Sequence, residues 1–144
     1  MTGSDLVQDF AAAFNRQDVP GLLACFTEDA VYHDIFYGRH QGRVGLKELF
    51  EKMFRDGRDS TWTMHVVVAD PLRAAAEWTF SYTVSEAIPR SAGKKVSFSG
   101  MSLFELKGGK AASYREYFDS GAAFLQLGFA PESLARVLAR RLPR

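Results

Sequence analysis

The sequence has little that would support metal, redox or nucleic-acid chemistry. It contains one cysteine, Cys25, so no disulfide can form within the chain. The three histidines, His33, His40 and His65, are dispersed and lack the short spacings typical of a zinc site. The formal net charge is +1, so no overall field attracts nucleic acid or a membrane surface. We therefore expect no metal, no cofactor, and no nucleic-acid or membrane partner.

Long apolar runs are also missing. No segment approaches the ~20 apolar residues that a membrane span needs, and the N-terminus lacks the basic stretch and apolar run of a signal peptide. The expected location is therefore the cytoplasm. A local excess of positive charge lies near the C-terminus at Arg136, Arg140, Arg141 and Arg144. We interpret it as one solvated face of a helix.

The composition is that of a globular domain. The 144 residues are 47% hydrophobic and 24% charged. This favours one domain with a hydrophobic core large enough to be stable without disulfide or metal cross-links. Aromatic residues reach 13%, and twelve residues are phenylalanine. This proportion fits a cavity lined by rings, and it fits a phenylalanine-rich core equally well.

The pattern of apolar residues predicts helices first and strands later. Apolar residues at helical spacing predict helices over residues 6–14, 19–26 and 43–54, with a strand over 30–36 between the second and third. A final amphipathic helix is expected over 131–142. We expect residues 1–144 to form one domain, with a core at about 6–128.

From Ser60 onward the apolar pattern has a period of two, as in strands. One face of the first long strand would carry Trp62, Met64, Val66 and Val68, and the other Thr63, His65 and Val67. Further strands are expected over 72–84, 95–106 and 111–118, with tight turns at Asp70-Pro71 and Gly108-Gly109. Helices segregated from long hairpins indicate an α+β fold. We expect a cone-shaped, strongly curved, mostly antiparallel sheet around the N-terminal helices, with an apolar pocket inside.

Three polar side chains stand in apolar surroundings. Tyr32 and Asp34 share a face of the strand VYHDIF, and Asp119 ends the last strand in YREYFD. A carboxylate in an apolar cavity has a raised pKa, which suits a general base near neutral pH. The alternative for each acid is structural: Asp34 caps a loop, and Asp119 caps the helix that follows it.

The sequence resembles the nuclear transport factor 2-like superfamily, in particular its SnoaL-like members. The segments that carry the resemblance are FAAAFNRQDVPGLLACFTEDAVYHD, GMSLFELKGGK and YREYFDSGAAFLQLG. The resemblance implies a cone fold, a small apolar ligand in its pocket, and a homodimer. Related enzymes include limonene-1,2-epoxide hydrolase, ketosteroid isomerase and polyketide cyclases.

Two of these activities need residues that this chain lacks. Tyr32, Asp34 and Asp119 match the water-holding residues of limonene-epoxide hydrolase, but Trp78 and Phe80 replace its Arg-x-Asp pair. Asp34 also matches the base of ketosteroid isomerase. The two oxyanion donors of that enzyme are replaced by Phe10 and, near the second donor's position, Ser102.

Polyketide cyclases of SnoaL type need the fewest catalytic groups in the site. The resemblance implies that Asp119 is the acid/base for an intramolecular aldol step, with Tyr32 and Asp34 orienting substrate or water. The substrate-binding residues expected are Trp78, Phe80, Tyr82, Phe10 and Phe14.

Three hypotheses follow from the sequence. The first is a cofactor-free isomerase, cyclase or hydrolase acting on a polyketide-like carbonyl compound. The second is a non-catalytic module that binds a small apolar molecule or a protein. The third is a dimer that uses its convex sheet face, where Thr63, His65 and Val67, or Glu77 and Thr79, would lie.

Overall fold

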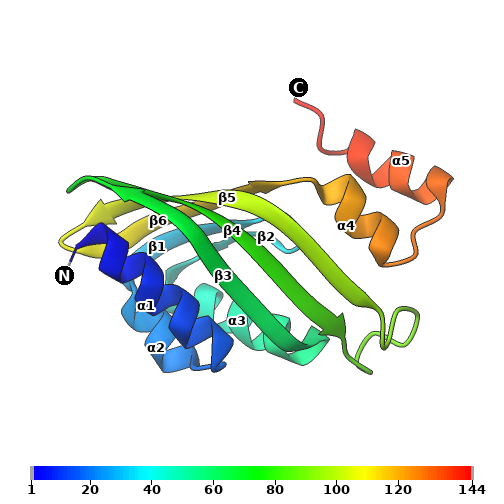
Figure 1. The fold of residues 1–144 in the computed structure, drawn as a ribbon, viewed down its shortest axis with the longest axis horizontal. Coiled ribbons are helices and arrows are strands. Elements are labelled where there is room, and N and C mark those ends of the chain that lie inside the picture. Colours follow the sequence, from blue (N-terminus) through cyan, green and yellow to red (C-terminus); the bar gives the residue numbers. More distant parts are fainter. Residues whose placement is uncertain (1, 144) are drawn as a thin grey trace.

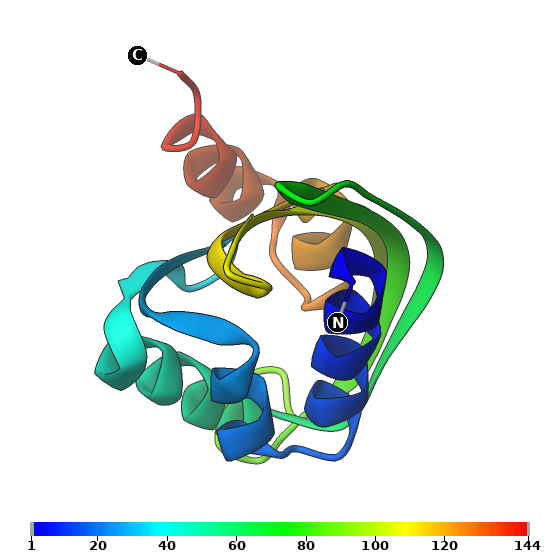
Figure 2. The same cartoon turned by 90° about the vertical axis from the view of Figure 1, so that its left-hand side faces the viewer.

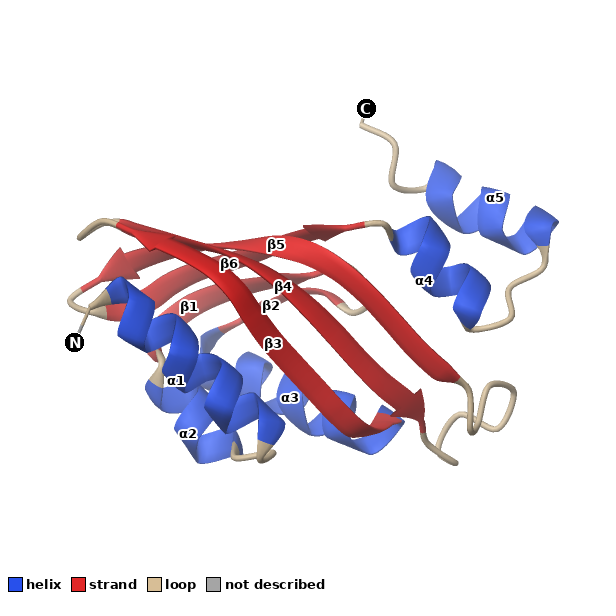
Figure 3. Cartoon of the chain, viewed as in Figure 1, coloured by secondary structure: helices blue, strands red, loops and turns tan. Residues whose placement is uncertain are grey.

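The computed structural model describes residues 2–143 and has five helices and six strands there (Figures 1 and 3). The helices are α1 (Gly3–Asn15), α2 (Val19–Ala24), α3 (Gly42–Asp56), α4 (Ser120–Gln126) and α5 (Pro131–Ala139). The strands are β1 (Phe26–Asp34), β2 (Gly38–Gln41), β3 (Gly57–Ala69), β4 (Arg73–Val84), β5 (Lys95–Lys107) and β6 (Lys110–Phe118). Arg144, the last member of the C-terminal basic group, lies outside the described residues.

The strands form one mixed sheet in the order β2-β1-β6-β5-β4-β3. Only β1 and β6 pair in parallel among these neighbours; the other four pairs are antiparallel. The sheet curls strongly around the side where α1, α2 and α3 lie (Figure 2). This arrangement confirms the expected α+β fold. Within residues 2–143, no helix is both long and apolar enough to cross a membrane.

The helices close the concave side of the sheet in different places. Helix α1 packs on β3, where the Asn15 side chain holds the main chain of Trp62 through two hydrogen bonds of 2.7 and 2.9 Å. Helix α3 packs on β1, and α4 packs on β5 beyond the other helices (Figure 1).

Several boundaries differ from the sequence prediction. Strand β1 begins at Phe26, earlier than the predicted strand over residues 30–36, and its pairing with β6 is irregular between Phe26 and Val31. Residues 38–41, between the predicted strand over 30–36 and the predicted helix over 43–54, form the short edge strand β2. The second helix ends at Ala24 and the last at Ala139, both earlier than predicted. After each helix a main-chain N–H donates to the carbonyl group three residues earlier, in a tighter turn than that of an α-helix.

A bulge in β3 overturns part of the predicted alternation. The register with β4 shifts between Met64 and Val66, so His65 is the extra residue. Trp62 and Met64 face the core as predicted, but Val66 and Val68 are 53% and 61% exposed. Val67 packs against the core instead of lying on the convex face.

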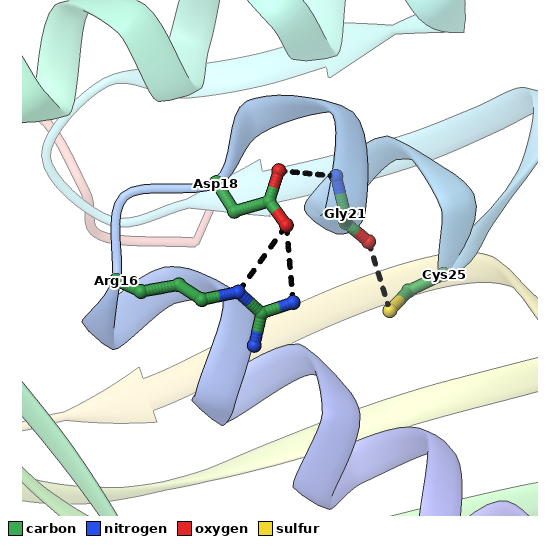
Figure 4. A network of polar contacts seen from close by, with 4 residues as sticks. All are labelled: Arg16, Asp18, Gly21 and Cys25. Atoms are coloured by element: carbon green, nitrogen blue, oxygen red, sulfur yellow. Dashed lines mark hydrogen bonds and ion pairs between the residues drawn. The ribbon is translucent and has the colours of Figure 1, made fainter.

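Helix α2 is tied to the end of α1 by a small polar network (Figure 4). Asp18 caps α2 by accepting the Gly21 main-chain N–H at 2.9 Å, and its other oxygen accepts from the Arg16 guanidinium at 3.0 and 3.2 Å. The Cys25 thiol donates to the Gly21 carbonyl oxygen at 3.5 Å. Cys25 is buried, and burial raises its thiol pKa to about 11, so it is a packing residue and no thiolate nucleophile.

Replacing Gly21 of α2 and Gly45 of α3 by alanine should change the stability of the protein in opposite directions. A Cβ at residue 21 would collide with the Asp18 carboxylate, so Gly21→Ala should lower the free energy of unfolding by about 1–2 kcal/mol. A Cβ at Gly45 in α3 would lie 3.8 Å from the nearest atom, in His40. Gly45→Ala should therefore raise the free energy of unfolding by up to about 1 kcal/mol. Urea denaturation of both variants measures the difference, and equal effects would contradict this account.

Candidate functional site

The concave side of the sheet holds a cavity with mostly apolar walls. Its volume is about 60 Å³, and about 540 Å³ is free of protein atoms when the open solvent at its mouth is included. Most of the lining is aromatic or aliphatic, and two carboxylic acids interrupt it. The lining residues are Phe14, Asp34, Phe36, Tyr37, Met53, Gly57, Ser60, Trp62, Trp78, Phe80, Tyr82, Phe98 and Glu116.

Four of the five predicted substrate-binding residues line this cavity. Trp78, Phe80 and Tyr82 do so because alternate residues of β4 face inward, and Phe14 reaches the cavity from the last turn of α1. Phe10 lies one turn earlier and does not reach it. Its ring is fully buried among five other aromatic rings, including Trp62 at a centroid distance of 5.0 Å.

Asp34 is the last residue of β1, and its side chain is turned into the cavity wall. It is 8% exposed, and its Oδ1 accepts the main-chain N–H groups of Phe36 at 2.7 Å and Tyr37 at 2.8 Å. Burial raises the pKa of Asp34 to about 6, although these two hydrogen bonds and the charges of His40 and Arg141 act in the opposite direction. Asp34 thus caps the turn after β1, as its structural alternative predicted, and also lines the cavity.

A second buried acid, Glu116, stands beside Asp34, and the sequence analysis missed it. The parallel register pairs Tyr32 with Tyr114 and His33 with Arg115, so the next inward-facing residues are Asp34 and Glu116. Glu116 is 7% exposed, and its Oε2 accepts the Ile35 main-chain N–H at 3.2 Å.

Burial and the neighbouring Asp34 charge shift the titration of Glu116. Burial is the larger cause, and together the two raise the pKa of Glu116 to about 8. Two carboxyl groups this close titrate as a pair, because the second proton is lost against the charge left by the first. Near neutral pH the pair therefore holds about one proton, and Glu116 has the higher pKa of the two.

A buried chain of hydrogen bonds ends at Glu116. The Trp78 indole donates to Ser102 Oγ at 2.8 Å, and Ser102 Oγ lies 2.7 Å from the Tyr114 hydroxyl. The Tyr114 hydroxyl donates to Glu116 Oε1 at 2.8 Å. Because an indole N–H can only donate, Ser102 is free to donate to Tyr114, and all donors in the chain then point toward Glu116. The chain fixes the orientation of the carboxyl group.

Tyr32 lies next to this site but does not line the cavity. Its ring is fully buried and stacks on Tyr114 with centroids 4.1 Å apart. Burial raises the pKa of Tyr32 well above its ordinary value. Its hydroxyl group has no hydrogen-bond partner among residues 2–143. Two other tyrosines, Tyr37 and Tyr82, do line the cavity, and burial raises the pKa of Tyr82 to about 12.

Asp119 is placed away from the other two predicted catalytic residues. It is exposed at the N-terminus of α4, where its Oδ1 accepts the Ala122 N–H at 3.0 Å. The expected convergence of Tyr32, Asp34 and Asp119 in one hollow is therefore not what the structure contains. Strand parity explains the difference, because Tyr114, Glu116 and Phe118 alternate with Arg115 and Tyr117. Asp119 follows Phe118 outside the strand, whereas Glu116 shares the inward face.

Metal ligands do not gather in the described structure. Within residues 2–143, no three histidine, cysteine, aspartate or glutamate side chains lie together in a way that could hold a metal ion. The carboxyl groups that line the cavity are those of Asp34 and Glu116, both with raised pKa values.

Solved structures with this fold include proteins of several activities. A candidate polyketide cyclase from Pseudomonas putida KT2440 is 28% identical, with a TM-score of 0.74 over 88% of this chain and 98% of that chain. An LEH-like epoxide hydrolase from M. tuberculosis is 21% identical, with a TM-score of 0.71 over 94% of each chain. A protein of ketosteroid isomerase-like fold from Catenulispora acidiphila is 16% identical, with a TM-score of 0.78 over 92% of this chain and 98% of that chain.

The last two likenesses concern the fold alone, whereas a family match covers much of the sequence. The SnoaL-like domain matches residues 7–114, from the first turns of α1 to the middle of β6. Asp34 lies inside this match, and Glu116 lies two residues beyond it. With this match and these neighbours, the chain belongs to the SnoaL-like domain family of the nuclear transport factor 2-like superfamily.

Proposed function

We propose that this protein is a cofactor-independent acid/base catalyst that enolises a small apolar carbonyl compound in the cavity. The observation that carries the proposal is the pair of adjacent buried carboxyl groups, Asp34 and Glu116, in a wall otherwise made of rings. Buried titratable groups with perturbed pKa values in a cavity are typical of active sites.

Asp34 is the general base of the proposed reaction. Its Oδ1 is occupied by two main-chain N–H groups, while its Oδ2 has no hydrogen-bond partner among the described residues. A pKa of about 6 keeps Asp34 ionised at neutral pH and gives it more basicity than an ordinary aspartate. Oδ2 would take a proton from the carbon next to the substrate carbonyl.

Glu116 is the general acid. Its pKa of about 8 means that it holds a proton at neutral pH. That proton would pass to the carbonyl oxygen while Asp34 takes the proton from carbon, so the substrate becomes a neutral enol and the pair exchanges roles. Proton return to another carbon gives an isomer, and attack of the enol on a second carbonyl group gives a cyclised aldol.

The composition of the wall supports an apolar substrate. Rings from α1, β3, β4 and β5 surround the acids, and water has limited access to a space this size. The likeness to a candidate polyketide cyclase supports the same substrate class, since polyketides carry several carbonyl groups. The alternative, a non-catalytic binding module, shares the cavity but makes no use of the acid pair.

A ketone whose α-protons exchange with solvent tests the proposed chemistry directly. With 2-tetralone in D₂O, the wild-type protein should accelerate loss of the α-proton NMR signal above the rate in buffer. Asp34→Asn should reduce this acceleration by about 10²–10⁴-fold, the usual contribution of a positioned base. Asp119→Asn, which keeps a good helix cap, should leave it unchanged. Loss of exchange in Asp119→Asn but not in Asp34→Asn would reverse the assignment, and absence of acceleration in wild type would favour the binding module.

The pH dependence of the same exchange should be bell-shaped. The rate should rise as Asp34 ionises near pH 6 and fall as Glu116 loses its proton near pH 8. Glu116→Gln should remove the alkaline fall and lower the maximum rate. A profile that rises steadily to pH 10 in wild type would exclude Glu116 as the acid.

Protein stability should depend on pH for the same reason. The folded-state pKa values of Asp34 and Glu116 lie above those of the unfolded chain, so between about pH 4 and 8 the native state binds more protons. The free energy of unfolding should therefore fall as pH rises through this window. Glu116→Gln should remove roughly 2–4 kcal/mol of that fall, measured by urea denaturation at pH 5 and pH 9. Glu77→Gln, on an exposed part of β4, is the matched control and should behave as wild type.

A further inference from the structure

The acid pair in the cavity has no cationic partner. No ion pair among residues 2–143 includes Asp34 or Glu116, and no lysine, arginine or histidine is among the described residues that line the cavity. Buried carboxylates in proteins are ordinarily paired with a cation or bound to a metal ion. The cavity wall therefore carries a negative charge that the side chains around it leave unpaired.

One oxygen atom of the acid pair also lacks a hydrogen-bond donor. Both oxygens of Glu116 and Oδ1 of Asp34 accept hydrogen bonds from N–H or O–H groups. Asp34 Oδ2 accepts none among residues 2–143, although Asp34 is only 8% exposed and lines the cavity. A buried acceptor without a donor is costly. A ligand in the cavity that carries both an N–H group and a positive charge would supply what Asp34 lacks.

Aromatic rings form most of the remaining wall. Trp78, Phe80 and Tyr82 face inward from β4, and the Trp62 ring of β3 packs against the first two with centroids 5.3 and 5.2 Å apart. An aromatic face attracts a cation within about 6 Å of its centroid and also accepts alkyl groups. Because no three metal-ligating side chains gather within residues 2–143, this wall favours an organic cation over a metal ion.

We propose that the cavity binds a compact alkylammonium ion, whose N–H group donates to Asp34 Oδ2 and whose alkyl groups lie among the rings. This inference goes beyond the proposed function, because it needs the charge of Asp34 and no transfer of a proton. A cavity of about 60 Å³ has room for roughly four water molecules. It therefore suits an ammonium head group of about five non-hydrogen atoms, and longer substituents would extend through the open mouth.

The groups around Asp34 decide how such a site responds to pH. Burial raises the pKa of Asp34 to about 6 and that of Glu116 to about 8, so the negative charge available to a cation grows in two steps. The charges of His40 and Arg141 also act on Asp34, from β2 and from the turn after α5. Asp56 accepts a hydrogen bond of 3.0 Å from a tyrosine of the lining. Burial also raises the pKa values of the nearby phenols, which therefore stay neutral up to pH 9; these are Tyr32, Tyr37 and Tyr82.

Two probes of equal shape and different charge test the proposal. The tert-butylammonium ion carries the charge, and tert-butanol is its neutral counterpart. The chain has two tryptophans, Trp62 and Trp78, and both line the cavity, so their indole N–H resonances report ligand entry. At pH 7 the wild-type protein should bind the ammonium ion at least about tenfold more tightly than the alcohol. Asp34→Asn should remove most of this preference and keep the binding of the alcohol. Glu77→Gln, on an exposed part of β4, removes the same charge elsewhere and should behave as wild type.

A pH series on the wild-type protein tests the same idea without a substitution. Affinity for the ammonium ion should rise about tenfold between pH 5 and pH 7, as Asp34 ionises, and rise again toward pH 9, as Glu116 loses its proton. Affinity for the alcohol should not follow this course. Glu116→Gln should abolish the second rise, and His40→Gln should keep both.

Three outcomes would overturn the cation site: equal binding of the two probes by wild type, binding of neither, or an undiminished preference for the ammonium ion in Asp34→Asn. If Asp34→Asn loses its dispersed indole resonances and is therefore unfolded, the pH series decides, and an affinity that does not change between pH 5 and pH 7 overturns the site. Ketone exchange without a preference for the cation would leave the proposed function standing. Cation binding without ketone exchange would leave the site standing and remove the proposed function.

Discussion

The structure depends on the burial of two carboxyl groups side by side on β1 and β6. Transfer of an ionised carboxylate from water to an apolar interior is costly, and two such charges in contact raise the cost further. The chain lowers this cost in two ways. It supplies donors to both groups, and it lets one of them keep its proton. The proton that the pair retains thus lowers the free-energy cost of burying both groups.

The surroundings decide which acid keeps the proton. Asp34 receives two short main-chain hydrogen bonds on one oxygen and feels the charges of His40 and Arg141, all of which favour its ionised form. Glu116 receives one main-chain hydrogen bond, at 3.2 Å, and the Tyr114 hydroxyl. The two main-chain donors and the two nearby cations at Asp34 favour its ionised form, in line with its lower pKa of about 6 against about 8 for Glu116. In the proposed reaction, the base and the acid would differ in their local surroundings and not in the kind of group they carry.

Sequence periodicity predicted most of the fold but only half of the acid pair. The helices and four long strands follow from the regular spacing of apolar residues. The bulge at His65 was not predicted, because an extra residue leaves no local signal in a run of valines. Glu116 has the strand parity of Tyr114 and Phe118, and that parity could have drawn attention to it. Its position beside Asp34 could not be derived from the sequence. The contact of Glu116 with Ile35 spans 81 positions, and it depends on the parallel pairing of β1 with β6.

Facing pairs of inward side chains follow one another along β1 and β6 and just beyond β1, and each pair is called a rung here. The order of these rungs places the two acids at the edge of the cavity. Tyr32 and Tyr114 form a stacked rung, Asp34 and Glu116 follow, and the rings of Phe36 and Phe118 come next at 5.4 Å from each other. The tyrosine rung does not line the cavity, while Asp34, Glu116 and Phe36 do, so the acids lie where packed rings give way to open space. The unpartnered Tyr32 hydroxyl costs about 1–3 kcal/mol, and its ring supports Tyr114, which orients Glu116. From the acids the cavity continues along the rings of Trp78, Phe80 and Tyr82 on β4, so the acids lie at the boundary between the packed β1–β6 side chains and the open part of the wall.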